Sequence, residues 1–203
     1  MIRSLAQGQK PALIINELQI GLLQEDIAVF PALARIAKKR DIVANVARLA
    51  AAFRAAGHPV FYTPVVNRPD AQGRKINSLI AAHSAKQNGM IAGTPSTLHP
   101  EAITPHPGDF VIDRGGGFIA MLGTTLDATL RRIGIETLVI TGISTNIAIP
   151  GNTIVAVEYG YHVVIPEDCI AAADEQAHSV IVEKQLRMLA TITDSSAVIA
   201  AIA

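Results

Sequence analysis

The segment at residues 138–159 constrains the fold more than any other part of the chain. It begins with the apolar run Leu-Val-Ile at 138–140, continues into a turn rich in Gly, Ser, Thr and Asn, and ends in a helical segment that Gly160 closes. A buried strand that leads through such a turn into a helix leaves free backbone N–H groups at the helix start, and these groups can bind an anion or a developing oxyanion. The turn is therefore the strongest candidate for a functional site. Because Pro150 is tolerated only in the first turn of a helix, we expect this helix to begin near Ala148.

Short apolar runs alternate with segments of helical periodicity along the whole chain. This alternation predicts an α/β fold, a three-layer sandwich in which a mostly parallel sheet carries helices on both faces. Further strands are expected at 12–15, 59–62, 110–112, 162–165 and 191–193, and further helices at 41–56, 75–87, 124–133, 175–189 and the C-terminus. A polar segment at 67–108, punctuated by Gly and Pro, is expected to be a long excursion over one edge.

Composition narrows the function classes. With 203 residues, half of them hydrophobic, the chain is expected to form a single domain over 1–203. Its 17 basic and 17 acidic residues are balanced and show no Lys/Arg run, which argues against nucleic acid and membrane surfaces and favours a small-molecule or protein partner. The single cysteine, Cys169, allows no internal disulfide, and the N-terminal apolar stretch is too short for a signal peptide, so we expect a cytoplasmic protein.

Three polar clusters follow predicted strands, at 16–17, 113–114 and 144–148. Ligands of parallel sheets bind beyond the carboxyl ends of the strands, so these clusters are expected to meet at one site. The three glycines at 115–117 do not have the spacing of a dinucleotide or P-loop fingerprint, and no nucleotide cofactor is expected. The six histidines are scattered without His-x-His or Asp-x-His pairing, and no metal is expected.

Taken together, the clusters resemble those of the isochorismatase-like cysteine hydrolase family, over nearly the whole chain. The most specific part is 138–168, with Thr-Gly-Ile-Ser-Thr-Asn-Ile-Ala-Ile at its centre and a strand ending in Asp168. The other matching parts are residues 12–19, 93–109 and 123–131. The resemblance implies an isochorismatase-like hydrolase and, because family members commonly form dimers and tetramers, a homo-oligomer.

The family's usual catalytic triad is an acidic residue, a Lys and a nucleophilic Cys. The resemblance places Glu17 at the acid, Arg114 at the Lys, with Asp113 as the alternative, and Ala148 at the Cys. Arg keeps the positive charge but cannot shuttle a proton at neutral pH, and Ala removes the nucleophile. The chain is thus expected to be a divergent, Cys-less member, in which Cys169 is a buried small apolar residue.

Two functions from different classes follow. In the first, Glu17 donates a proton to a vinyl ether, as in isochorismatases, while Arg114 binds a substrate carboxylate and the turn at Ser144, Thr145, Asn146 and Ile147 binds a polar oxygen. In the second, the protein is catalytically inactive and acts as a small-molecule binding or assembly protein. A Ser or Thr nucleophile is not favoured because no His lies in the three clusters.

Structural roles remain open alternatives for the same residues. Glu17 would then be a strand-end carboxylate in an ion pair, Arg114 a solvated loop charge, and Thr145 and Asn146 ordinary turn or cap residues.

Overall fold

The computed structural model describes residues 2–6, 8–87 and 89–203. Its centre is a seven-stranded sheet with the order β3-β2-β1-β4-β5-β7, in which every strand pair is parallel and the short β6 pairs with the carboxyl end of β4. The strands are β1 Pro11–Asn16, β2 Val60–Thr63, β3 Phe110–Val111, β4 Thr137–Ile143, β5 His162–Pro166, β6 Ile170–Ala171 and β7 Thr191–Thr193. The predicted α/β sandwich is confirmed.

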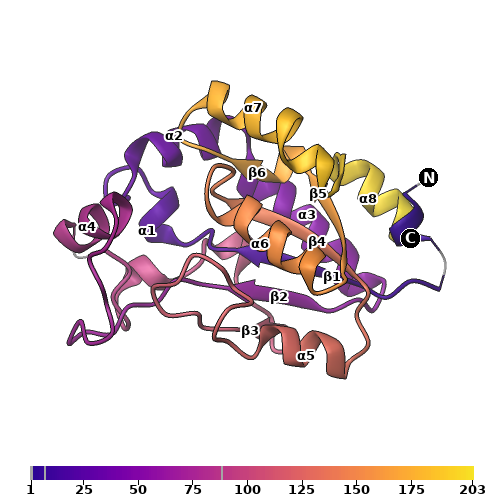
Figure 1. Cartoon of the computed structure of the whole chain (residues 1–203), viewed down its shortest axis with the longest axis horizontal. Coiled ribbons are helices and arrows are strands. Elements are labelled where there is room, and N and C mark those ends of the chain that lie inside the picture. The colour runs from indigo at the N-terminus through magenta and orange to yellow at the C-terminus, as the bar shows by residue number, and fades with distance from the viewer. Residues whose placement is uncertain (1, 7, 88) are drawn as a thin grey trace.

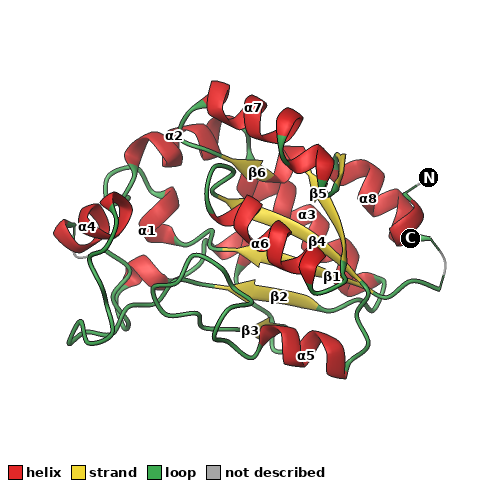
Figure 2. Cartoon of the chain, viewed as in Figure 1, coloured by secondary structure: helices red, strands yellow, loops and turns green. Residues whose placement is uncertain are grey.

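Helices cover both faces of this sheet (Figures 1 and 2). The α-helices are α1 Ile20–Leu23, α2 Pro31–Lys39, α3 Ile42–Ala55, α4 Leu79–Lys86, α5 Leu126–Arg132, α6 Ala148–Glu158, α7 Glu175–Lys184 and α8 Ser195–Ile202. Short 3-10 helices lie at Arg3–Leu5, Pro95–Thr97, Glu101–Ile103, Glu167–Cys169 and Leu186–Met188. No helix within the described ranges has both the length and the apolar character needed to cross a membrane.

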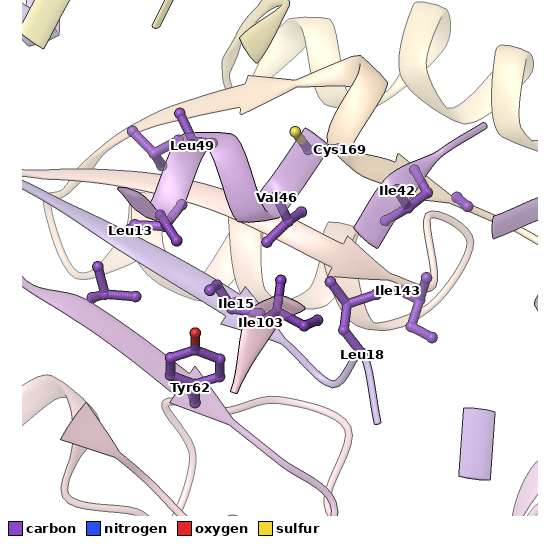
Figure 3. Packing of buried hydrophobic residues seen from close by; sticks show 14 of the residues in the cluster. Leu13, Ile15, Leu18, Ile42, Val46, Leu49, Tyr62, Ile103, Ile143 and Cys169 are labelled. Carbon is purple, nitrogen blue, oxygen red and sulfur yellow. The ribbon is translucent and has the colours of Figure 1, made fainter. Parts of the chain in front are cut away.

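The alternation of side chains along the buried strands divides the core into two clusters. In β1, Leu13 and Ile15 pack on the face covered by α2, α3 and α8, whereas Ala12 and Ile14 pack on the face covered by α5, α6 and α7. Figure 3 shows the first cluster, with Leu13 and Ile15 near the α3 side chains. A strand buried on both faces reads as a continuous apolar run, which is why β1 was recognisable in the sequence.

Two of the expected helices have different bounds, and two further helices were not expected. The helix expected at 75–87 begins only at Leu79, because the Ser78 hydroxyl caps it by accepting a hydrogen bond from the Ala81 N–H at 3.2 Å. The helix expected at 175–189 ends at Lys184, and a separate 3-10 turn follows. Helices α1 and α2 were not predicted. The first has only four residues, and the second begins at Pro31, where a proline suits the first turn of a helix, so its start signal was overlooked.

Candidate functional site

The site lies where β1 and β4 end side by side. Asn16 of β1 is in register with Gly142 of β4, and the chain then leaves the sheet at Glu17 and Leu18, both with left-handed backbone angles (φ of 65° and 53°). Left-handed conformations are uncommon for residues other than glycine, so this turn fixes the direction in which Glu17 leaves the strand. The peptide bond between Ile143 and Ser144, at the end of β4, is cis.

A cavity of about 740 Å³ opens beyond these strand ends. The predicted catalytic positions Glu17, Arg114 and Ala148 all line it. Of the four residues predicted to bind substrate, Ser144, Asn146 and Ile147 also line it. The three clusters that are far apart in the sequence therefore meet at one cavity.

Glu17 and Arg114 form an ion pair inside this cavity. The guanidinium Nη2 donates a hydrogen bond to Oε1 of Glu17, and Nη1 donates to Oδ1 of Asn16 at 3.1 Å and to the Phe118 carbonyl at 2.8 Å. The Arg114 side chain is fully buried and that of Glu17 is 13% exposed. Arg114 is therefore not a solvated loop charge, and its terminal nitrogens already bind groups of the chain itself. Asp113, the alternative for the cation position, is exposed and accepts a hydrogen bond from the Gly115 N–H at 2.7 Å.

Two buried asparagines hold this arrangement together: Asn16, which belongs to the first polar cluster but was given no role, and Asn152, which sequence reasoning missed. The Asn16 amide donates to the Ile143 carbonyl at 2.5 Å, while its Oδ1 accepts from Arg114, from the Thr63 hydroxyl at 3.2 Å and from Asn152 at 3.3 Å. Asn152 lies one turn into α6, where it donates to the Ala148 carbonyl at 2.8 Å and accepts from the Ala120 N–H at 2.7 Å. A spacing of four residues from Ala148 was the only sequence signal for Asn152.

Burial dominates the protonation equilibrium of Glu17. Desolvation raises the pKa of Glu17 above its ordinary value, and the charge and hydrogen bond of Arg114 only partly offset this rise. A larger fraction of Glu17 is therefore protonated near neutral pH than for an exposed glutamate. A carboxyl group in this condition can donate a proton to a bound ligand.

The start of α6 supplies free hydrogen-bond donors to the same cavity. Helix α6 begins at Ala148, as the position of Pro150 predicted. Among the described residues, the backbone N–H groups of Asn146 and Ala148 have no hydrogen-bond acceptor, whereas that of Ile147 donates to the Ser144 carbonyl at 3.2 Å. Free N–H groups at a helix N-terminus favour a partial negative charge on a ligand oxygen.

Thr145, predicted to bind substrate, points away from the cavity. Its side chain is fully buried, and its hydroxyl lies 3.0 Å from Nδ1 of His178 on α7. No histidine belongs to the three sequence clusters, but α7 brings His178 beside the turn from a distant part of the sequence. On its other side, Nε2 of His178 is 3.5 Å from the Glu167 carboxylate. Because Thr145 does not reach the cavity, this chain of contacts supports the turn and offers no accessible nucleophile.

Cys169 is fully buried, as expected, and packs in the first core cluster. Desolvation, reinforced by Asp168, raises the pKa of its thiol far above the ordinary value, so the reactive thiolate is disfavoured. Within residues 2–6, 8–87 and 89–203, no group of three or more His, Cys, Asp or Glu side chains is placed to hold a metal ion.

Comparison with known proteins identifies the family of this chain. The isochorismatase domain model matches residues 11–197. An uncharacterised isochorismatase family protein of Escherichia coli, YecD, is 35% identical over 176 residues, which cover 83% of each chain. The ureidoacrylate amidohydrolase RutB of Methylobacterium radiotolerans is 35% identical over 122 residues, which cover 53% of this chain and 46% of the relative.

Solved structures agree in fold. A cysteine hydrolase from Pseudomonas syringae superposes with a TM-score of 0.82 at 20% identity, covering 100% of this chain and 96% of the other. An isochorismatase family protein from Desulfovibrio vulgaris gives a TM-score of 0.79 at 24% identity, covering 94% and 96%. Since the domain model spans nearly the whole chain and YecD exceeds 30% identity over most of it, this protein belongs to the isochorismatase family.

Proposed function

We propose that this chain is a hydrolase of a small molecule that works without a covalent intermediate and uses Glu17 as its proton donor. The observation that carries the proposal is the buried Glu17 carboxyl, which has a raised pKa and lines a cavity together with Ala148, at the position of the family nucleophile. Alanine has no group that can attack a substrate. A mechanism that needs only an acid and a water molecule fits these residues.

Hydrolysis of a vinyl ether meets that requirement. Protonated Glu17 gives its proton to the terminal vinyl carbon, which leaves an oxocarbenium ion, and a water molecule adds to the positive carbon. The water returns a proton to the Glu17 carboxylate, and the resulting hemiketal separates into a ketone and an alcohol. Arg114 stabilises the Glu17 carboxylate during the step in which it is charged.

The sequence suggested that Arg114 binds a substrate carboxylate. We do not propose this role, because its terminal nitrogens donate hydrogen bonds to Glu17, Asn16 and the Phe118 carbonyl. The free N–H groups of Asn146 and Ala148 are better placed to bind a substrate oxygen. The names of two relatives, ureidoacrylate amidohydrolase and maleamate amidohydrolase, point to amide hydrolysis. With Ala148 at the position of the nucleophile, amide hydrolysis through a thioester is not expected here.

The test is hydrolysis of isochorismate, a 1-carboxyvinyl ether that releases pyruvate, followed with a lactate dehydrogenase coupled assay. We expect Glu17→Gln to lower the rate by about 100-fold or more, the usual range for the loss of a general acid. Glu183→Gln, which changes an exposed glutamate on α7, serves as the control and should leave the rate unchanged. Equal pyruvate release by the Glu17→Gln variant and the parent would refute the proposed role.

The absence of a nucleophilic group at Ala148 also supports a second candidate, a catalytically inactive binding protein that keeps the cavity. This candidate predicts that a ligand raises the melting temperature and is recovered unchanged after long incubation. Chemical conversion of the ligand at a rate that depends on Glu17 would exclude it.

A further inference from the structure

The charges along the cavity wall are unequal. Four cations, Arg68, Arg74, Lys75 and Arg114, line it together with one carboxylate, that of Glu17. Arg114 is fully buried and donates a hydrogen bond to Glu17, so it is not available at the mouth of the cavity. An excess of positive charge therefore remains in the outer part.

Two of these cations have no carboxylate partner. Arg68 pairs with Asp70, with Nη2 to Oδ2 at 2.6 Å and Nε to Oδ1 at 3.0 Å. Arg74 donates only to the neutral Ser84 hydroxyl, at 2.9 Å, and in the described part of the chain neither Arg74 nor Lys75 lies within 4.0 Å of a carboxylate. Arg74 is half-buried and Lys75 is exposed, so both belong to the mouth.

Part of the cavity wall is apolar. Leu22 of α1, Val29, Leu33 of α2 and Met90 are buried residues that line the cavity. Ile80 of α4 adds to this wall. Figure 1 shows that the connection from β2 to α4, which carries both unpaired cations, extends outward from the sheet, to the left of the view. A cavity of about 740 Å³ is large enough for a ligand that spans this apolar section.

We propose that the cavity takes an elongated ligand with three parts. A polar group lies at Glu17 and the start of α6, an apolar body lies along the wall of α1, α2 and α4, and an anionic end group, carboxylate or phosphate, is bound at the mouth by Arg74 and Lys75. The arginine fork can hold either anion through two hydrogen bonds, and the lysine adds a second positive charge. This assignment names the ligand class for the cavity and rests on the function proposed above.

Binding of defined probes tests it without requiring turnover. The probes are aliphatic half-amides from succinamate to sebacamate, each with an amide at one end and a carboxylate at the other, and the matching uncharged diamides. We expect at least one half-amide to bind about tenfold more tightly than its diamide by titration calorimetry, and the preference to shrink in high salt.

The variant Arg74→Gln/Lys75→Gln should weaken the binding of that half-amide about tenfold and leave the diamide unchanged. Lys86→Gln is the matched control, because Lys86 is an exposed lysine on α4 that does not line the cavity. A phosphonate in place of the carboxylate then distinguishes the two anions: tighter binding of either one supports the proposal and identifies the end group.

The proposal is overturned if no half-amide binds better than its diamide, or if the double variant keeps the preference. These outcomes are separate from the test of Glu17. If the Glu17→Gln variant hydrolyses isochorismate as fast as the parent while the half-amide preference stands, the catalytic role fails and the binding class remains.

Discussion

At the scale of single residues, two opposing effects act on Glu17. Burial raises its pKa, while the adjacent Arg114 guanidinium lowers it, and burial has the larger effect. The folded chain therefore binds the Glu17 proton more tightly than the unfolded chain does. This property links the proposed proton donor to the pH dependence of stability.

Because the pKa of Glu17 is raised in the folded chain, the contribution of this residue to stability decreases as the pH rises. The contribution of Glu17 to the free energy of unfolding is fully present below the ordinary pKa of 4.5 and is lost as the pH rises through the higher folded value. Glutamine has no proton to lose, so we expect the Glu17→Gln variant to gain stability relative to the parent as the pH rises above the ordinary pKa of 4.5. Urea unfolding of both proteins at several pH values measures the difference.

Glu183→Gln provides the control for this measurement, because the residue is exposed and makes no ion pair in the described part of the chain. The difference in stability between the Glu183→Gln variant and the parent should not increase with pH, in contrast to the difference expected for Glu17→Gln. A difference between parent and Glu17→Gln that moves in the opposite direction would show that the charge attraction of Arg114 outweighs burial.

At the scale of elements, the site depends on how closely β1 and β4 approach. Gly142 has a φ of +104°, and a Cβ placed there would lie 2.0 Å from the Asn16 carbonyl oxygen. The absence of a side chain thus lets Asn16 sit beside β4 and donate its amide hydrogen bond to the Ile143 carbonyl. Glycine is needed at this position for two reasons, the backbone angle and the close contact.

Gly142→Ala should therefore be strongly destabilising. Backbone strain and overpacking together are expected to lower the free energy of unfolding by about 3 kcal/mol or more. Gly57→Ala is the matched control, since Gly57 has a φ of +76° but nothing lies within 4 Å of an added Cβ, so only the strain, about 1 kcal/mol, applies. Equal losses for the two variants, measured by urea unfolding, would mean that the contact with Asn16 is unimportant.

The sequence predicted the features that depend on local pattern. Apolar runs predicted the strands, and the rule that the carboxyl ends of parallel strands meet at one edge predicted that Glu17, Arg114 and Ala148 lie close together. The sequence did not predict features that depend on contacts between distant residues. These are the hydrogen bonds from Arg114 and Asn152 to Asn16 and the position of His178 beside Thr145. Polar side chains acquire such partners only through tertiary packing, which a single sequence does not display.

At the scale of the whole molecule, both core clusters depend on the same sheet. Leu49 of α3 is fully buried on one face, and Leu130 of α5 is fully buried on the other. Strand β1 contributes alternate side chains to both clusters, so neither face can lose its packing without exposing side chains of the shared strands. This arrangement supports the prediction of one cooperative domain over 1–203, which unfolding measurements can test.

Leu49→Ala and Leu130→Ala should each lower the midpoint of one common unfolding transition. Each substitution removes a buried side chain and is expected to cost about 2–5 kcal/mol. For both variants, far-UV circular dichroism and tyrosine fluorescence should give superimposable urea curves, because tyrosines lie in both clusters: Tyr62 in the first and Tyr161 in the second. If one variant instead shows two separate transitions, or if the two probes report different midpoints, the faces unfold independently and the chain contains more than one cooperative unit.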